Sequence, residues 1–174
     1  RRDRSASEPL KNLATKARLP QVRAQALAAL EGISGLDAAT LKSALKDSGE
    51  NVRALAVRFS ESHLDKVLDD VIALTKDSST ILAKQVAFTL GESSNRKAGE
   101  ALAALAKKWS DNSEIRLAVL SSARPHAETI LNAIGANNTD WASPLIATMI
   151  GSGDKQAIAR AVKETGHAYG EPLS

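Results

Sequence analysis

The hexapeptide Val22-Arg23-Ala24-Gln25-Ala26-Leu27 decides the fold, because the chain repeats it. The same pattern returns thirty residues later as Val52-Arg53-Ala54-Leu55-Ala56-Val57. A third, weaker copy is Leu82-Ala83-Lys84-Gln85-Val86-Ala87, and a fourth, thirty-three residues further on, is Ile115-Arg116-Leu117-Ala118-Val119-Leu120. A fixed period of about 20 to 50 residues is typical of a stacked array, in which each unit buries its apolar side against its neighbours. The sequence therefore predicts a succession of similar units.

The composition favours helices. Apolar residues make up 43% of the 174 residues, and alanine and leucine dominate them, whereas Phe, Trp and Tyr together occupy only five positions. Alanine and leucine favour helix, and strands are enriched in aromatic and β-branched residues. We therefore expect an all-α protein.

Turn and cap signals divide the chain into pairs of helices. Proline in a first turn, Ser, Asp or Asn before an apolar periodic run, and Gly after it mark the helix ends. Ser7 is expected to cap the first helix, Asp37 the third and Asn51 the fourth. The predicted pairs are 7–17 with 20–32, 37–47 with 51–59, 64–74 with 79–90, and 96–109 with 112–123.

The ends of the chain lack a copy of the motif. Residues 1–6 form a polar tail, and Pro125 interrupts the chain after the fourth pair. An array needs a terminal unit with a polar outer face. We therefore predict four hairpin repeats in residues 7–123 and capping helices in residues 124–174. The expected capping segments lie near 126–135, 141–150 and 155–165.

The repeat resembles a known family. Paired helices with an acidic turn, followed by Asn51-Val52-Arg53-Ala54-Leu55-Ala56, resemble HEAT-like repeats of the phycobilisome-lyase type over about residues 8–123. More specifically, residues 22–27, Phe88-Thr89-Leu90-Gly91-Glu92 and Leu117-Ala118-Val119-Leu120-Ser121-Ser122 resemble the HEAT segment of large bacterial predicted membrane-bound dehydrogenases. The third copy departs from the pattern at Ala83.

The predicted architecture is accordingly an all-α, right-handed α-solenoid of four HEAT-like hairpins with a C-terminal helical cap, about eleven helices in all. In the dehydrogenases that the chain resembles, a β-propeller precedes the helical segment and a c-type cytochrome domain follows it. The resemblance implies such flanking domains and a periplasmic or extracellular setting. Neither a propeller nor a Cys-x-x-Cys-His haem motif occurs in these 174 residues.

The net charge of +3 is concentrated near the N-terminus. The first thirty residues hold seven Lys or Arg and two acidic residues, whereas the remaining 144 hold sixteen basic and eighteen acidic residues. Electrostatic binding to phosphate needs a basic face on the folded surface, so nucleic acid is not expected as a partner. No apolar run approaches the roughly 20 residues that span a bilayer, so we expect no transmembrane segment.

Charged residues recur at fixed places in the repeat. Arginine takes the second position of the motif in three copies, and an aspartate lies in the turn five to seven residues before the cation of each later copy. We expect each cation to reach the acidic turn of its own or the adjacent unit, because charges near an interface are seldom left unpaired. A ligand-binding stripe is the alternative. The first expectation gives a repeated series of ion pairs between units, which we call the ladder. Its candidates are Arg23, Arg53, Lys84 and Arg116 with Asp47, Asp77 and Asp111.

The chain shows no pattern of catalytic or metal-binding residues. It has no cysteine, and none of its three histidines has the spacing of a zinc motif. His63, close to Asp65 at a helix start, is predicted to cap that helix. We therefore expect no enzymatic activity, no metal and no cofactor. Trp109 and Trp141 flank turns, where each either fills a groove between units or anchors a partner. Arg58 is a further candidate anchor.

These observations predict a non-catalytic interaction or spacer module of a larger protein. Its partner would be another protein or the flanking domains of the same chain, held at fixed separation by the stacked hairpins. Two alternatives stay open. A HEAT-like DNA-binding or base-repair protein would need a basic channel with aromatic and carboxylate side chains. A chromophore-lyase-like subunit is suggested by the repeat type alone.

Overall fold

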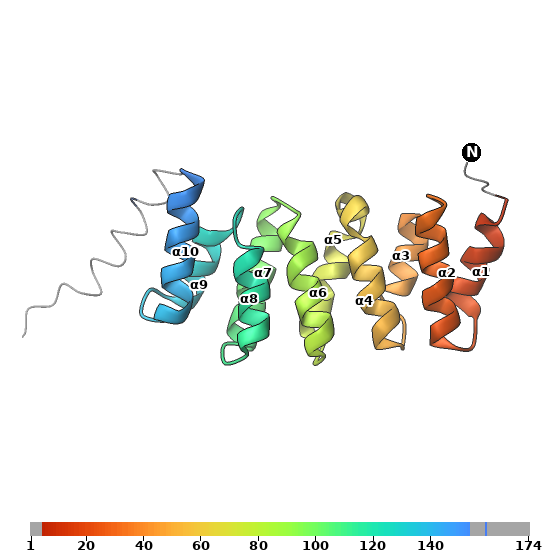
Figure 1. Ribbon diagram of the computed structural model, residues 1–174, viewed down its shortest axis with the longest axis horizontal. Coiled ribbons are helices and arrows are strands. Elements are labelled where there is room, and N and C mark those ends of the chain that lie inside the picture. Colours follow the sequence, from red (N-terminus) through yellow and green to blue (C-terminus); the bar gives the residue numbers. More distant parts are fainter. Residues whose placement is uncertain (1–4, 154–158, 160–174) are drawn as a thin grey trace, which may run out of the picture. The chain divides into compact units, whose positions relative to one another are not determined.

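The computed structural model describes residues 5–153 and residue 159, and this part of the chain contains helices and turns without a strand (Figure 1). The all-α expectation is therefore confirmed. The chain forms two compact units, which divide between Thr89 and Leu90. The division falls inside one helix, α6 (Thr80–Gly91). The last predicted segment, 155–165, lies outside the described residues apart from residue 159.

The first unit consists of three helical hairpins. A short 3-10 turn, η1 (Glu61–His63), precedes the third hairpin, and a second, η2 (Leu74–Lys76), separates its two helices. The helices of the three hairpins are α1 (Ser7–Lys16) with α2 (Pro20–Gly32), α3 (Ala38–Ala44) with α4 (Glu50–Phe59), and α5 (Leu64–Ala73) with α6.

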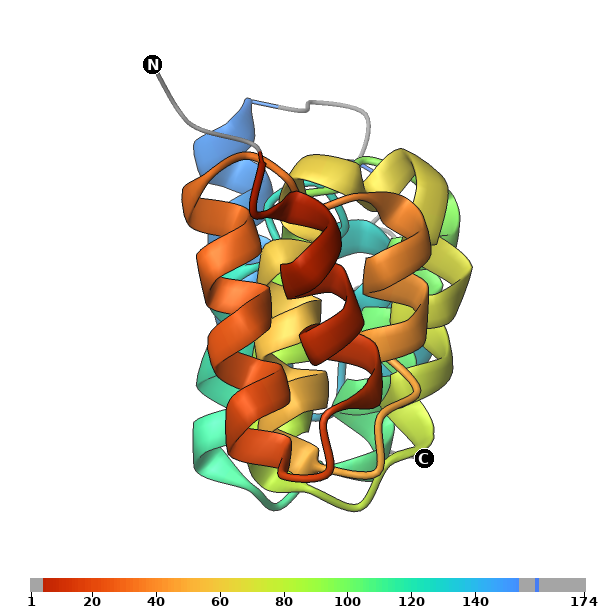
Figure 2. The same cartoon turned by 90° about the vertical axis from the view of Figure 1, so that its right-hand side faces the viewer.

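In consecutive hairpins of the first unit, first helices pack on first helices and second helices on second helices. Helix α1 contacts α3, α3 contacts α5, and α2 contacts α4, while each of the first two hairpins also packs on itself. The two layers are visible in Figure 2, where α2 and α4 lie on one side and α3 and α5 on the other. Apolar residues of the repeated motif fill the space between them. Leu27, Val52, Ala56 and Val57 have no exposed surface, and burial of each larger apolar side chain contributes about 1.5–3 kcal/mol.

Two predicted helix caps are wrong. Helix α1 begins at Ser7 itself, after Ala6, and α4 begins at Glu50, which places Asn51 inside the first turn. The residue that organises the turn before α4 is Asp47, whose Oδ1 accepts a hydrogen bond from the Gly49 N–H at 2.7 Å. A carboxylate that bonds a backbone N–H two residues ahead closes the turn before Asn51 can cap the helix.

The cap predicted at Asp37 is present. Its Oδ1 accepts a hydrogen bond from the Thr40 N–H at 2.8 Å, and its Oδ2 lies 2.8 Å from the ammonium nitrogen of Lys11 on α1. The Lys11 ammonium and the Thr40 N–H lower the pKa of Asp37 to about 2. His63 occupies the position before α5, but its side chain makes no capping bond there and instead contacts the Ser62 hydroxyl.

The second unit contains two further hairpins in its described part. These are α7 (Arg96–Lys108) with α8 (Ser113–Ser121), and α9 (Ala127–Ile134) with α10 (Thr139–Ser152). Helix α9 packs on α7 and on α10, and α10 also contacts α8. The segment expected to be an irregular cap thus begins with another helical pair. Its first helix packs on the first helix of the preceding pair and its second helix on the second.

Candidate ion-pair ladder and exposed helix face

A largely buried charge pair of the first unit joins Arg23 on α2 to Asp47 in the turn after α3. Both nitrogens of one edge of the guanidinium take part, with Nε 2.6 Å from Oδ2 and Nη2 2.7 Å from Oδ1. About a tenth of each side chain is exposed. The remaining Nη1 donates to the carbonyl oxygens of Ala17 and Arg18 at 2.8 and 3.2 Å. Arg23 therefore links the turn of its own hairpin to the turn of the next.

Arg53 repeats this arrangement one hairpin later. Its Nη2 lies 2.8 Å from Oδ2 of Asp77, and its Nη1 donates to the carbonyl oxygens of Asp47 and Ser48 at 2.8 and 3.2 Å. The acceptors lie six and five residues before the arginine, as they do for Arg23. Asp47 consequently accepts hydrogen bonds from Arg23 on its carboxylate and from Arg53 on its backbone carbonyl oxygen. The two arginine–aspartate pairs, which we call the rungs of the ladder, therefore meet at Asp47.

The aspartates of the ladder also fix their own turns. Asp77 Oδ1 accepts the Ser79 N–H at 2.9 Å, as Asp47 accepts that of Gly49. Although partial burial acts to raise the pKa of Asp47, hydrogen bonds from Arg23 and Gly49 outweigh it, so the pKa is lowered. The Ser79 N–H is the main cause of the lowered pKa of Asp77, and Arg53 adds to it. Both carboxylates are therefore held ionised at neutral pH.

In the second unit, Arg116 contacts Asp140 and not the expected Asp111. Its Nη1 lies 3.1 Å from Oδ2 of Asp140 at the start of α10, a pair that is considerably more exposed than the first two. Asp111 instead accepts a hydrogen bond from the Ser110 hydroxyl. All three ladder arginines thus reach the aspartate 24 residues further along the chain. This offset was a usable sequence signal, because no other arginine of the chain has Asp at that distance.

The third copy of the motif supplies no arginine to the ladder. The position that corresponds to Arg53 is Ala83, which is 2% exposed. Lys84 is one residue further along α6 and half-buried.

Lysine–aspartate pairs join the first helices of consecutive hairpins as well. Lys11 on α1 reaches Asp37 before α3, and Lys46 after α3 lies 3.0 Å from Asp70 on α5. The Lys46 side chain is 72% exposed. Pairs that are this open to water contribute little to stability, so the arginine rungs are the stronger ties between hairpins.

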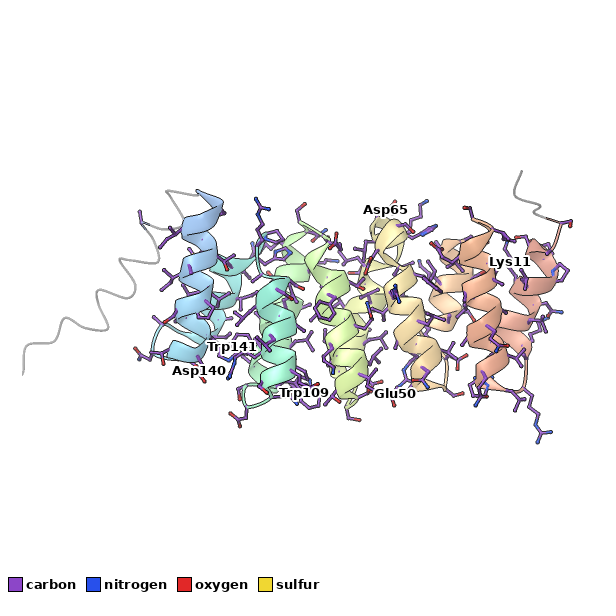
Figure 3. All side chains as sticks on the ribbon, viewed as in Figure 1. Lys11, Glu50, Asp65, Trp109, Asp140 and Trp141 are labelled. Atoms are coloured by element: carbon purple, nitrogen blue, oxygen red, sulfur yellow. The ribbon has the colours of Figure 1, made fainter. Side chains whose placement is uncertain are left out.

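The candidate anchors differ in accessibility. Trp141, at the start of α10 (Figure 3), is 1% exposed and belongs to the core of the second unit, so it offers no surface to a partner. Trp109 is half-buried beneath the Lys108 ammonium, which lies 5.4 Å from the ring centre, and its indole N–H has no hydrogen-bond partner among the described residues. Arg58 is exposed on α4.

The second helices of the first unit leave one continuous side uncovered, which we call the second-helix face. Helical spacing of i, i+3, i+4 and i+7 puts four positions of each helix on it, and these are half-buried or exposed. Sequence analysis missed its two large apolar members, Ile81 and Phe88, which are 55% and 46% exposed. The face consists of Gln21, Ala24, Gln25 and Ala28 on α2, Asn51, Ala54, Leu55 and Arg58 on α4, and Ile81, Lys84, Gln85 and Phe88 on α6.

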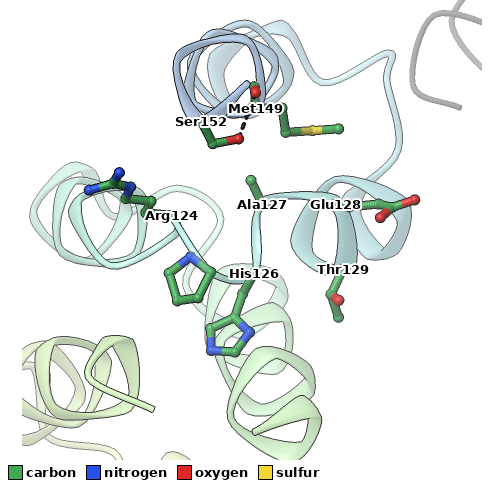
Figure 4. A pocket seen from close by; sticks show the side chains of 8 residues that line it. Arg124, His126, Ala127, Glu128, Thr129, Met149 and Ser152 are labelled. Atoms are coloured by element: carbon green, nitrogen blue, oxygen red, sulfur yellow. Dashed lines mark hydrogen bonds between the residues drawn. The ribbon is translucent and has the colours of Figure 1, made fainter. Parts of the chain in front are cut away.

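Two of the hollows among the described residues lie at helix ends. One, of about 430 Å³, lies between the starts of α2 and α4 on the second-helix face. The other, of about 120 Å³, lies between the start of α9 and the end of α10 (Figure 4). Its histidine, His126, is 4% exposed, and Nε2 lies 2.6 Å from the carbonyl oxygen of Ser93. Burial lowers the pKa of His126, against the opposing effect of that carbonyl.

His126 serves the packing of the second unit. A Cβ at Gly99 on α7 would come within 2.7 Å of its Nδ1, so the glycine is needed for the imidazole to fit. A neutral, buried ring pressed on a helix backbone is a core group, and it does not provide an accessible base.

Comparison of the sequence with known protein families and with curated proteins finds no match. Within residues 5–153 and 159, no three or more His, Asp or Glu side chains gather in a way that could hold a metal ion. The helices of this same part are too short or too polar to cross a membrane.

Proposed function

We propose that the chain is a protein-interaction or spacer module built as a right-handed α-solenoid of HEAT-like hairpins. The observation that carries the proposal is the pair of equivalent rungs in the first unit, Arg23–Asp47 and Arg53–Asp77. Each ion pair joins two turns that belong to consecutive hairpins. In both, the arginine binds an aspartate 24 residues further along the chain through Nη2, and its Nη1 donates to the carbonyl oxygens six and five residues before it. Arg23 adds a second bond to its aspartate through Nε. A role that recurs at equivalent positions of successive hairpins fits an architectural purpose, whereas a catalytic or ligand site usually breaks the repeat.

The geometry suits a spacer. Because one guanidinium binds a carboxylate on the next hairpin and two carbonyls of its own, it fixes both the distance and the rotation between them. The second-helix face remains available while the hairpins are held in this way. A module of this kind acts through its shape and through the side chains that it presents.

The resemblance to large bacterial dehydrogenases extends the proposal to the flanking domains. A β-propeller before this segment and a c-type cytochrome after it would be held apart by the array, outside the cytoplasm. A Cys-x-x-Cys-His motif encoded downstream of this segment supports the assignment, and a gene without propeller or haem sequences opposes it.

Removal of one period tests the array. Deletion of residues 48–77 joins Asp47 to Ser78 and keeps every remaining turn in phase, because the period is thirty residues. We expect this variant to keep its helical circular dichroism per residue and a cooperative urea transition. The matched control, deletion of residues 48–62, removes half a period and should abolish the transition. Equal behaviour of the two deletions would contradict the proposal.

A further inference from the structure

One side of the first hairpin is open where the later hairpins are covered. Val52 on α4 and Leu82 on α6 begin the second and third copies of the motif, and neither has any exposed surface. Their counterpart on α2 is Val22, which is half-buried. Figure 2 looks onto this side of the first unit, with α1 and α2 nearest to the viewer.

Contacts of the later hairpins show that this is the side turned toward a preceding hairpin. The Thr89 hydroxyl on α6 donates to a carbonyl oxygen of α4, and the counterpart of Thr89 sixty residues earlier is Ala29, which is exposed. A Cβ at Gly49, before α4, would come within 3.0 Å of Pro20 Cβ on α2. The counterpart of Gly49 thirty residues earlier is Leu19, which is 58% exposed.

Helix α1 adds a large apolar residue to this side. Leu13 is 46% exposed and lies two residues from Lys11, whose ammonium binds Asp37 of the next hairpin. Two residues span about 200° around a helix, so Leu13 points away from that hairpin. We call the open surface the leading face, and it consists of Leu13, Leu19, Val22 and Ala29.

The turn beside the leading face lacks the carboxylate of the ladder. The turns before α4 and α6 read Lys46-Asp47-Ser48 and Lys76-Asp77-Ser78, whereas the turn before α2 reads Lys16-Ala17-Arg18. In the later turns the aspartate binds an arginine of the preceding hairpin. At the first turn an alanine replaces this aspartate and an arginine replaces the serine. A preceding element with a ladder arginine would therefore meet cations and no acceptor, which is unfavourable.

Two cations of this turn are available to a partner. Residues 9–30 include no acid. Of the four cations in this stretch, Lys11 and Arg23 pair with aspartates of the next hairpin. The side chains of Lys16 and Arg18 are exposed and form no ion pair within the described part of the chain. The leading face thus combines apolar side chains with positive charge at one end.

We propose that the leading face binds an acidic amphipathic helix of a protein partner. A helix suits the face because the second and third hairpins present the same side to the helices before them. Its apolar side chains contact Leu13, Leu19 and Val22, and its Asp or Glu side chains pair with Lys16 and Arg18. This proposal depends on the proposed function as an interaction module and specifies the chemistry of the partner.

Two other occupants suit the leading face less well. A second copy of the chain, placed with its leading face against the first, would bring no carboxylate to Lys16 and Arg18. An anionic lipid surface would pair with these cations, but membrane binding relies on large apolar side chains that can enter the lipid. Val22 is half-buried and Ala29 is small, so a helix covers this face better than lipid does.

The test uses two fluorescein-labelled peptides of 18 residues with the same leucine pattern on one side. One peptide carries Glu on the flanks of that side, and its twin carries Lys. Fluorescence anisotropy with the full chain should show saturable binding of the Glu peptide, with a dissociation constant of about 0.1 mM or below. The Lys peptide should bind at least about tenfold more weakly. Equal binding of the two peptides, or no binding of the Glu peptide, would overturn the proposal.

Surface variants locate the binding site. Leu19→Ser should weaken binding of the Glu peptide by about tenfold, and Arg18→Glu should reduce or reverse the preference for Glu over Lys. The matched controls are Phe88→Ser and Arg58→Glu, which make the same kinds of change at exposed positions of α6 and α4. Both controls should leave binding unchanged. Equal losses in the variants and their controls would contradict the assigned face, and circular dichroism confirms that all four variants are folded.

The other occupants give distinct results in the same material. Concentration-dependent dimerisation in sedimentation, abolished by Leu19→Ser, would replace the proposal with a second copy. Co-sedimentation with phosphatidylserine vesicles but not with phosphatidylcholine vesicles, abolished by Arg18→Glu, would replace it with a lipid surface. Deletion of residues 48–77 leaves the whole first hairpin in place, so the partner chemistry and the array are tested separately.

Discussion

Replacement of Asp47 by alanine should break the ladder at its most buried point. The variant loses two charge-assisted bonds from Arg23 and the bond that closes the turn at Gly49, and it leaves a guanidinium without its carboxylate. Removal of one partner costs about 3–5 kcal/mol for a fully buried pair, whereas a whole exposed pair is worth about 0–1 kcal/mol. Asp47 is 10% exposed on its side chain, so we expect a loss of about 2–4 kcal/mol in the free energy of unfolding.

Urea denaturation followed by circular dichroism measures this loss, and thermal melting should show a decrease of roughly 5–15 °C. Asp111→Ala is the matched control, because Asp111 occupies the corresponding turn but is exposed and contacts only Ser110 among the described residues. Its effect should stay within about 0.5 kcal/mol. A variant of Asp47 that unfolds at the same urea concentration as the Asp111 variant would refute the ladder as a structural element.

The pH dependence gives a second readout of the same residue. The folded-state pKa of Asp47 is lowered, so its stabilising contribution is complete above an unfolded-state pKa of about 3.9 and is lost as the pH falls through the lower folded value. The difference in stability between wild type and Asp47→Ala should therefore be constant near neutral pH and narrow below about pH 4. In a double-mutant cycle with Arg23→Ala, the two losses should be far from additive.

Three further predictions concern packing. Gly91→Ala should destabilise the second unit by about 1–3 kcal/mol in urea, because a Cβ there would come within 2.9 Å of the Ser122 backbone, whereas Gly151→Ala, which meets no atom within 4 Å, should be neutral or slightly stabilising. His126 has a lowered pKa, so stability should be constant above about pH 6.5 and fall below it, and His126→Gln should remove this dependence between pH 7.5 and 5.5. Ala56→Asp puts a carboxylate at a position with no exposed surface, so helical circular dichroism should be largely lost, and a melting curve like that of wild type would show the inward face to be misassigned.

The helix pairs were predictable because local signals agree with the packing. Apolar spacing and the turn residues around Pro20, Asp37 and Asn112 mark the helix ends, and the buried residues of the repeated motif point to the neighbouring hairpin. The error at Asn51 arose because a cap was assigned from residue type alone. In the fold, Asp47 closes the same turn four residues earlier.

The ladder was only partly predictable. The expectation named the correct arginines, but it placed Asp111 in the ladder because it looked for acids near copies of the motif. Asp140 was missed since α10 carries no such copy, although the constant offset of 24 residues pointed to it.

The second-helix face could be identified only from the structure. In the third motif copy, apolar residues lie on both sides of α6, so periodicity alone did not show that Ile81 and Phe88 are exposed. The burial of His126 likewise depends on a glycine, Gly99, that lies twenty-seven residues away in another helix.

The central claim, that successive hairpins of the first unit stack in register, is tested most directly by distances between equivalent sites. The chain has no cysteine, so pairs of introduced cysteines can carry spin labels at Ala28, Arg58 and Phe88, which are exposed positions on α2, α4 and α6. Neighbouring packed helices are about 10 Å apart. Electron paramagnetic resonance should therefore give about 20 Å for the 28–88 pair and about half of that for the 28–58 pair. A 28–88 distance no longer than the 28–58 distance would contradict the stacked array.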